Sequence, residues 1–369
     1  MKKRPSWLSI VIAASFALRA IAIILVALSG DFYEHWQIAG NILRGKAYYL
    51  GPPASIDSSL HMGSIYYYLI AFFRLISLGN YKIALLLFSF INSLGIYLFY
   101  KLAINWLGNR AAVISTLLLA FGRYSIEVSS YLWNPYFTPL LLILLLYSFQ
   151  KPNSKVWAVF SGLSISVLLH LHFSNWLLVP LYGYFLYKLY LKNKLNAFIN
   201  FFSALLIFLP YAFFLFKDIS IVELLPFFKL ENCNFSYWLV NHGQGERCFS
   251  YFRNSLFILR LFSFSIFGSM NLLLLVLSVL MIFYFSKFID LQKKMEYIFW
   301  LFFPWLALLF YSGNVYLHHF LFLMPLALMV FGKVVDNLLS TRKNIAWLII
   351  GICILGNISS LIFLFTSFR

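Results

Sequence analysis

Runs of about twenty apolar residues recur along the whole chain, and short segments carrying lysine and arginine separate them. An α-helix of that length crosses the roughly 30 Å hydrocarbon core of a bilayer. Only 11% of the residues are charged and the mean hydropathy is +0.85, whereas a soluble domain typically has about 25% charged residues. Because a spanning segment must satisfy its own backbone hydrogen bonds, we predict an all-α polytopic membrane protein.

We predict about eleven transmembrane helices, over residues 8–29, 83–105, 110–126, 136–150, 156–171, 174–190, 196–216, 255–285, 297–312, 316–333 and 344–366. The first run is too long for the apolar core of a typical signal peptide, so we interpret it as a retained helix with a cytoplasmic N-terminus. No polar interval is long enough for a separate soluble domain. We therefore expect one transmembrane domain, residues 1–369, whose first outer loop is 30–81.

The segment 62–78 is ambiguous, because it is apolar but short and contains Arg74. Cytoplasmic loops of membrane proteins carry an excess of lysine and arginine. If 62–78 lies along the outer membrane surface, the later basic loops fall on the same side as the basic residues 2–4. If it spans, those loops move outside. We therefore predict an in-plane helix in the first extracytoplasmic loop. The residues that decide the orientation are Lys101, Arg110, Lys151, Lys155, Lys188, Lys192, Lys194, Lys287, Lys293, Lys294, Lys333, Arg342 and Lys343.

This topology gathers most of the ionisable side chains on or near the outer face. All seven histidines lie there, at positions 35, 61, 170, 172, 242, 318 and 319. Eight of the eleven acids do too, namely Asp31, Glu34, Asp57, Glu127, Asp218, Glu223, Glu231 and Glu246. Ionisable residues at a membrane are costly and tend to mark function. The net charge of +17 is divided among short loops rather than gathered in one basic patch, which excludes nucleic-acid binding.

The stretch 30–61 holds the densest group of candidate residues. Asp31 has two interpretations: it caps a helix over Phe32–Leu43, or it is a general base that takes a proton from an attacking hydroxyl. Glu34 and His35 are either substrate- or metal-binding residues or exposed loop residues. His61 ends the stretch and is a further substrate-binding candidate.

Two histidine pairs are candidates for binding substrate. His170 and His172 lie where one helix ends and the next begins, and they can converge on a ligand if the backbone between them is extended. The alternative is a hydrogen-bonded histidine at the membrane interface. His318 and His319 open a helix at the outer side, where they can donate hydrogen bonds to a phosphate.

Three arginines are placed where a charge needs an explanation. Arg253 and Arg260 lie seven residues apart, on one helical face, and are the best candidates for gripping a phosphate. The alternative is a side chain that reaches the lipid headgroups. Arg19 falls near the middle of the first span, so we expect it to face the bundle interior or a wet cavity, with a buried acid as a candidate partner.

The cysteines constrain little. Cys233 and Cys248 share the long outer loop, where an oxidising compartment permits a disulfide, and the sequence leaves that bridge open. Cys353 lies in the last predicted helix, where we expect it to pack as a small apolar residue.

Three motifs stand in the first half of the chain. They are Asp31-x-Tyr33…Ala39…Leu43-x-Gly45 followed by Gly51-Pro52 and His61-Met-Gly63-Ser-Ile-Tyr66-Tyr67-Tyr68; Trp133-Asn134-Pro135-Tyr-Phe-Thr-Pro139; and Gly162-Leu-Ser-Ile-Ser…His170-Leu-His172. The first two resemble outer loops of integral-membrane glycosyltransferases of the GT-C fold, and the third resembles their Gly-rich helix ending in a histidine. The narrower resemblance is to protein O-mannosyltransferases and the lipid A aminoarabinose transferase, which are glycosyltransferase family 39-like. A weaker echo, Tyr316-Leu-His318-His319-Phe320…Pro325, stands in the second half.

This resemblance implies a hexosyl- or pentosyltransferase whose donor is a sugar on a polyprenyl phosphate. Transfer would take place on the extracytoplasmic face of the cell membrane, with inversion at the anomeric carbon and Asp31 as the base. The acceptor would be a lipid, a glycan or a protein. Asn134 stands where many mannosyltransferase-like relatives carry an acid, which argues against a metal-bridging role there. Asn134 is predicted to bind substrate, and no metal ligand is assigned. A divalent metal cofactor stays open.

Two other functions are compatible with the sequence. A transporter or flippase for a lipid-linked sugar would also be polytopic, but transporters usually show repeats and broken helices with polar groups at the membrane midplane. In this chain the polar residues lie at the predicted outer ends of the helices instead. A relative that binds a lipid-linked sugar without turnover is the third possibility, and the presence of Asp31 argues against it.

Overall fold

The computed structural model describes residues 6–25, 30–53, 61–218, 250–269, 271–287, 296, 298–304 and 316–366, and they are almost entirely helical. The bundle consists of α1 (Ser6–Leu25), α4 (Tyr81–Leu107), α5 (Asn109–Phe121), α6 (Arg123–Ser129), η1 (Asn134–Phe137), α7 (Thr138–Phe149), α8 (Lys155–Leu171), η2 (Phe173–Leu178), α9 (Val179–Lys192), α10 (Lys194–Asp218), α13 (Ser250–Phe267), α14 (Leu272–Ser286), η4 (Ile298–Phe302), η5 (Leu317–Leu323), α17 (Met324–Thr341) and α18 (Lys343–Thr366). The proposed Cys233–Cys248 bridge and residues Asp57 and His242 lie outside the described residues.

Within these residues, five helices are long and apolar enough to cross a membrane, or seven if each of two bent pairs counts as one span. A polytopic membrane protein is therefore confirmed. Several predicted spans are shorter than that criterion, because α7 has 12 residues and α9 has 14. The total of eleven spans stays a prediction.

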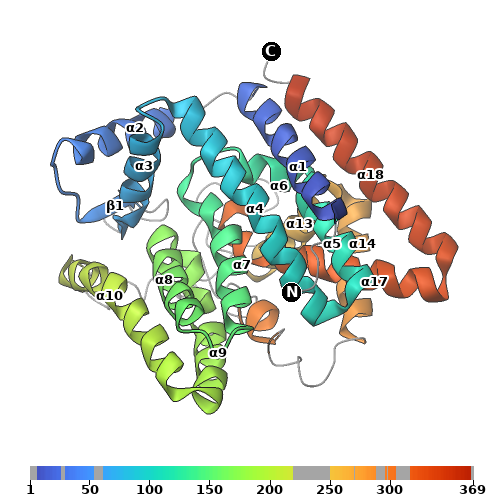
Figure 1. Cartoon of the computed structure of the whole chain (residues 1–369). Coiled ribbons are helices and arrows are strands. Elements are labelled where there is room, and N and C mark those ends of the chain that lie inside the picture. Colours follow the sequence, from blue (N-terminus) through green and yellow to red (C-terminus); the bar gives the residue numbers. More distant parts are fainter. Residues whose placement is uncertain are drawn as a thin grey trace.

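The first outer loop folds into a small unit of its own. It comprises α2 (Gly30–Leu43), the strands β1 (Leu50–Pro53) and β2 (His61–Gly63), and α3 (Ile65–Ile76). The two strands pair antiparallel. Figure 1 shows α2, α3 and β1 grouped at one end of α4. At about 1.5 Å per residue, the 12 residues of α3 extend roughly 18 Å, less than the hydrocarbon thickness. This length supports the predicted in-plane helix, whose orientation in a membrane stays a prediction.

Arg74, which made 62–78 ambiguous, joins α3 to α2. Its guanidinium donates a hydrogen bond to the carbonyl of Trp36 and lies 5.1 Å from the centre of the Trp36 indole. A Cβ at Gly40 would lie 2.8 Å from the Arg74 Cζ, so glycine makes room for this contact. The Arg74 guanidinium therefore binds inside the first-loop unit and does not have to face lipid.

The predicted span 110–126 is broken. The axes of α5 and α6 differ by 57°, and the break lies at Gly122. Arg19 of α1 is 1% exposed and donates hydrogen bonds to the carbonyls of Leu119 (3.2 Å) and Ala120 (2.9 Å), which the break leaves without helical partners. It also donates to the hydroxyls of Ser15 and Ser129. The expected acidic partner of Arg19 is therefore wrong: helix-end carbonyls and hydroxyls take its place.

The predicted span 255–285 is also not one straight helix, because α13 and α14 meet at 96°. Asn357 of α18 joins this break to the first one. Its side-chain nitrogen donates to the carbonyl of Ile266 (2.8 Å), near the end of α13, and its oxygen accepts from the backbone N–H of Arg123 (2.8 Å), at the start of α6. One buried amide thus satisfies backbone groups at two helix ends.

Helix α17 lies at the centre of the apolar core, among α5, α13, α14 and α18 (Figure 1). From Met324 to Val335 nearly every side chain is buried, so α17 is covered by protein on all sides. At Gly332 an added Cβ would overlap the Ser115 hydroxyl and approach the Ala111 carbonyl at 2.5 Å. The small residue lets α17 and α5 pack with their backbones close together, as is usual in membrane helix pairs.

The predicted cytoplasmic loops contact one another in pairs. Arg110 and Asp336 form an ion pair at 3.2 Å, and Lys188 and Glu296 form another at 2.7 Å. Each pair joins two segments that the charge distribution assigns to the same side. The grouping of these loops is therefore consistent with the structure, although the side of the membrane stays a prediction.

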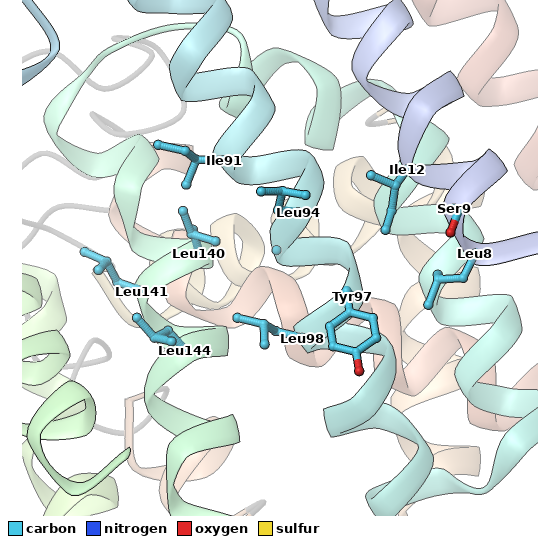
Figure 2. A pocket seen from close by; sticks show the side chains of 11 residues that line it. Leu8, Ser9, Ile12, Ile91, Leu94, Tyr97, Leu98, Leu140, Leu141 and Leu144 are labelled. Atoms are coloured by element: carbon cyan, nitrogen blue, oxygen red, sulfur yellow. The ribbon is translucent and has the colours of Figure 1, made fainter. Parts of the chain in front are cut away.

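An apolar groove of about 550 Å³ lies between α1, α4 and α7 (Figure 2). Its lining consists of Leu8, Ser9, Ile12, Ile91, Leu94, Gly95, Tyr97, Leu98, Leu140, Leu141 and Leu144. Counting along α4, Leu98 lies about 26 Å from Tyr81, the end beside the first-loop unit. This groove therefore lies away from the candidate site described next.

Candidate functional site

A hydrogen-bond chain connects the first loop to the second. His35 of α2 is buried, and its Nδ1 lies 3.1 Å from the hydroxyl of Tyr66 in α3. That hydroxyl donates to the carbonyl of Leu132 at 3.3 Å. Since a hydroxyl has one proton to donate, Tyr66 accepts from the Nδ1–H of His35. His35 therefore fixes the position of the first loop against the segment before η1.

Asp31 and Glu34 are exposed in the first turns of α2, beside this chain. Helix α2 begins at Gly30, so Asp31 lies in the first helical turn, where the helix dipole favours a carboxylate, rather than at the expected cap position. Burial lowers the pKa of His35, and the negative charges of Glu34 and Asp31 oppose that shift to a smaller extent. His35 is thus a neutral imidazole near pH 7, with the side chains of Asp31 and Glu34 close by.

Asn134 ties the second loop to two other segments. Its side-chain nitrogen donates to the carbonyl of Leu171 at 3.0 Å and to the sulfur of Met62 at 2.9 Å. The residue is 4% exposed. Its amide nitrogen therefore serves packing between β2, η1 and the end of α8, and its predicted contact with substrate is left untested.

His61 and His170 belong to the same packed layer. His61 Nδ1 lies 3.0 Å from the Gly51 carbonyl, and Tyr211 of α10 donates to the His61 carbonyl at 3.2 Å. His170 Nε2 lies 3.1 Å from the carbonyl of Ile207, and its ring packs on Tyr211 at 4.6 Å. These contacts hold the first-loop unit against α8 and α10.

Three histidines from two distant segments meet at one point. His172 follows α8 in an extended conformation, with φ −160° and ψ 138°, whereas His318 and His319 stand in η5. The ring centre of His319 lies 4.7 Å from that of His172 and 4.6 Å from that of His318. One ring nitrogen from each histidine lies within 4.8 Å of the other two. We call His172, His318 and His319 the histidine cluster.

Aromatic rings pack against the histidine cluster. The Trp133 ring lies 4.5 Å from the His318 ring in an edge contact, and the Tyr316 ring stacks on the His318 ring at 5.4 Å. His172 and His319 are buried, and His318 is partly exposed. The sequence pointed to each histidine pair separately, but it predicted His170 as the neighbour of His172; the structure places His319 and His318 there. Trp133 and Tyr66 were visible only as members of motifs, without a role.

The two candidate arginines lie on the helix beside this cluster. Arg253 and Arg260 are both in α13, and α13 packs against η5. Arg260 lies over the Phe257 ring at 5.4 Å. The side chain of Arg253 lies outside the described residues. Arg123 forms an ion pair with Glu127 at 3.0 Å, and its guanidinium lies 4.5 Å from the Phe264 ring of α13. Glu127 was placed on the outer face from the sequence, but its pairing with Arg123 was not predicted. The four-residue spacing of the two charges could have indicated the pair.

A second apolar groove, of about 500 Å³, begins next to His170 and runs between α8, η2, α9 and α10. Its lining is Ile165, Ser166, Leu169, Trp176, Leu177, Val179, Pro180, Tyr182, Phe201, Ala204, Leu205, Phe208 and Phe303. Trp176 donates its indole N–H to the Leu169 carbonyl at 3.1 Å, so its polar group is satisfied inside the wall. The wall of the groove is therefore almost entirely apolar, which suits an apolar chain.

The chain shares its fold with two integral-membrane glycosyltransferases of the GT-C fold. The predicted all-α GT-C fold is therefore confirmed, whereas the eleven spans and the in-plane orientation of α3 stay predictions. One similar structure is ArnT from Cupriavidus metallidurans bound to undecaprenyl phosphate, with a TM-score of 0.60 and 12% identity over 92% of this chain. Another is the archaeal oligosaccharyltransferase AglB from Archaeoglobus fulgidus in complex with an inhibitory peptide and a dolichol-phosphate, with a TM-score of 0.53 and 12% identity over 98% of this chain.

The likeness is one of fold. This chain spans 62% of the ArnT chain and 56% of the AglB chain. A structure of the A. fulgidus oligosaccharyltransferase in complex with Zn and sulfate is similar as well, with a TM-score of 0.57, 13% identity and coverage of 96% of this chain and 52% of that one. No protein-family profile and no curated protein sequence matches the chain.

Proposed function

We propose that this protein is a membrane glycosyltransferase that moves a sugar from a polyprenyl-phosphate donor to an acceptor hydroxyl on a lipid, glycan or protein. The observation that carries the proposal is the connection of the acidic first loop, through His35 and Tyr66, to the segment whose Trp133 packs on the histidine cluster. A carboxylate for the acceptor and proton-bearing groups for a phosphate are thus held on one scaffold.

The similar proteins support the class of donor. The ArnT structure holds undecaprenyl phosphate and the AglB structure holds a dolichol-phosphate, and both compounds are polyprenyl phosphates. In this chain the groove beside His170 is suited to the apolar tail of such a lipid. Phe208 in the wall of this groove lies 6.5 Å from the His170 ring, so a lipid in the groove could leave its phosphate near that histidine.

In the proposed reaction, Asp31 takes the proton of the acceptor hydroxyl as its oxygen attacks the anomeric carbon. The bond between that carbon and the phosphate oxygen breaks, and the electron pair leaves with the polyprenyl phosphate. Attack from the face opposite the phosphate inverts the anomeric centre. Arg253, Arg260 and the histidine cluster would stabilise the negative charge of the leaving phosphate.

The proposal places this chemistry on the extracytoplasmic side of the cell membrane. The basic loops that pair through Arg110–Asp336 and Lys188–Glu296 would then face the cytoplasm. With α3 lying in the membrane plane, eleven spans would complete the bundle.

The test is transfer of labelled sugar from a panel of polyprenyl-phosphate donors by the purified chain and by Asp31→Asn. Removing a general base typically costs 10²–10⁴-fold in rate, so we expect a loss of about that size with an unchanged thermal unfolding midpoint. Asp336→Asn is the matched control, because it also removes a carboxylate but at the predicted cytoplasmic end. Full transfer by a folded Asp31→Asn variant would contradict the assigned role.

One observation favours the alternative of a lipid-linked sugar flippase, namely the two broken helix pairs, since discontinuous helices are common in transporters. However, the freed groups are already satisfied: Arg19 caps the end of α5, and Asn357 bonds to α6 and α13. The breaks therefore leave few groups to bind a substrate. Transbilayer movement of a labelled lipid-linked sugar in liposomes, without transfer to an acceptor, would support the flippase.

A further inference from the structure

We propose that His172, His318 and His319 bind a divalent transition-metal ion, and that the open coordination position of that ion accepts a phosphate oxygen of the donor. This inference deepens the proposed function, on which its second half rests. The first half, metal binding, stands independently of it. Within the described residues this is the one group of three side chains from which metal ligands converge.

The distances suit a metal after a small side-chain adjustment. The three ligand nitrogens lie within 4.8 Å of one another. A tetrahedral ion with Zn–N bonds of about 2.0–2.1 Å holds its ligand nitrogens about 3.4 Å apart. Rotation of three imidazoles about their side-chain bonds can close that difference. Two of the three come from adjacent residues of one tight helix, so the backbone already brings them together.

The burial of His319 is otherwise unexplained. His319 is 4% exposed, and its Nε2 has no hydrogen-bond partner within the described residues. A buried polar atom without a partner destabilises the folded protein. A metal ion would supply that partner. The rings of Trp133 and Tyr316 pack against His318 at the edge of the cluster.

A second contact prepares His172 as a ligand. Its Nδ1 lies 2.8 Å from the Ser174 hydroxyl and 3.2 Å from the Ser174 backbone nitrogen. When Nδ1–H donates to the hydroxyl, the lone pair of Nε2 is free for a metal. Such an outer hydrogen bond fixes the tautomer of most metal-binding histidines. Metal binding at Nε2 therefore favours the His172 tautomer with its proton on Nδ1 over the tautomer whose Nδ1 accepts from the Ser174 backbone N–H.

The ligand set indicates the kind of ion and leaves a position for substrate. Imidazole nitrogens suit zinc and the other late first-row metals, whereas magnesium and calcium prefer oxygen. Zinc bound by three histidines keeps a fourth position for water or substrate. A phosphate oxygen in that position would place the positive charge where the leaving group gains its negative charge. The histidines would thus act on the phosphate through the ion rather than directly.

The test is cobalt binding to the full-length protein, purified without a polyhistidine tag and treated with a chelator. Co²⁺ in a tetrahedral nitrogen site has visible absorption bands, which report the site without any activity assay. We expect one equivalent of Co²⁺ per chain, displaced by Zn²⁺. Replacing His318 or His319 with Gln should weaken binding by at least about 100-fold, and Ser174→Ala by about 10-fold or more. His170→Gln is the matched control, because it removes a buried histidine two residues from His172.

The outcomes separate the two halves of the inference. Absence of saturable binding, or equal binding by the His172→Gln/His319→Gln variant, would overturn the metal site. Bound Co²⁺ whose spectrum does not respond to a short-chain polyprenyl phosphate would overturn the phosphate role, and inorganic phosphate distinguishes headgroup recognition from general anion binding. If the metal binds and the spectrum responds while no donor supports sugar transfer, the metal site and its contact with a phosphate stand, while the role in sugar transfer and the proposed function fail.

Discussion

The imidazole of His170 determines which residue can occupy position 63. A Cβ added to Gly63 would overlap the ring of His170, whose Nε2 lies 3.1 Å from the Ile207 carbonyl. The same glycine pairs with Leu50 in the strand ladder, so the backbone is held from the other side as well. The motif His61-Met-Gly63 therefore contains glycine for a steric reason, which is that the first loop must lie directly on α8.

We expect Gly63→Ala to destabilise the protein by about 1–3 kcal/mol, the usual cost of forcing an extra methyl group into a packed site. The measurement is the thermal unfolding midpoint in detergent. Gly183→Ala is the control, because nothing lies within 4 Å of a Cβ at that position. Adding His170→Ala to Gly63→Ala should recover part of the loss by making room. If Gly63→Ala unfolds at the same temperature as the control, the close contact is not present in solution.

Residue types at the site were predictable from the sequence, but their partners were not. The scarcity of acids drew attention to Asp31 and Glu34, and both are exposed at the start of α2. Asn134 was predicted to bind substrate, whereas its amide nitrogen bonds to Leu171 and Met62. Hydrogen-bond partners so far apart along the chain depend on packing, and no local pattern encodes them.

At the scale of helices, two predicted spans proved to be bent pairs. The segment 110–126 is apolar enough to be taken as one span despite Gly122 and Arg123, and hydropathy alone does not register a 57° bend. The bend is stable because Arg19 and Asn357, from other helices, satisfy the freed backbone groups. A mid-helix arginine thus indicated buried polar structure correctly, although the sequence did not identify its partners.

The close helix crossing at Gly332 gives a prediction for the pair α5 and α17. We expect Gly332→Leu to lower the thermal unfolding midpoint strongly, because its side chain would overlap Ser115 and Ala111 and push the two helices apart. Gly351→Leu in α18 is the matched control, since no atom lies within 4 Å of its Cβ position. A Gly332→Leu variant as stable as Gly351→Leu would show that this crossing is looser than described.

At the scale of the whole molecule, the arrangement separates the candidate site at one end from paired basic loops at the other. The first-loop unit bonds through Tyr66 to the segment before η1, whose Trp133 ring packs on His318 of the histidine cluster. It also bonds through the His61 carbonyl to Tyr211 of α10, the helix that forms one wall of the groove beside His170. Arg110–Asp336 and Lys188–Glu296 join the predicted cytoplasmic loops. The sequence predicted this division through the positive-inside rule, with α3 lying in the membrane plane.

Cysteine labelling of intact cells tests that topology. In a chain with Cys233, Cys248 and Cys353 replaced by Ser, we expect Lys46→Cys to react with a membrane-impermeant maleimide. Arg342→Cys should react only after permeabilisation. Both positions are exposed, so burial does not decide the result. Reaction of both in intact cells would mean that 62–78 spans the membrane and that the predicted orientation is wrong.

By itself, the sequence determined the class of protein, the positions of most helices, the GT-C resemblance and a set of candidate residues that includes every member of the histidine cluster. These features are local, because hydropathy, charge and short motifs are read within one segment. Only the tertiary structure decided that His172 meets His318 and His319 rather than His170, and that Arg19 and Asn357 complete broken helices. Those contacts join residues about 100 or more positions apart, so they follow from the way the helices pack, which no single segment specifies.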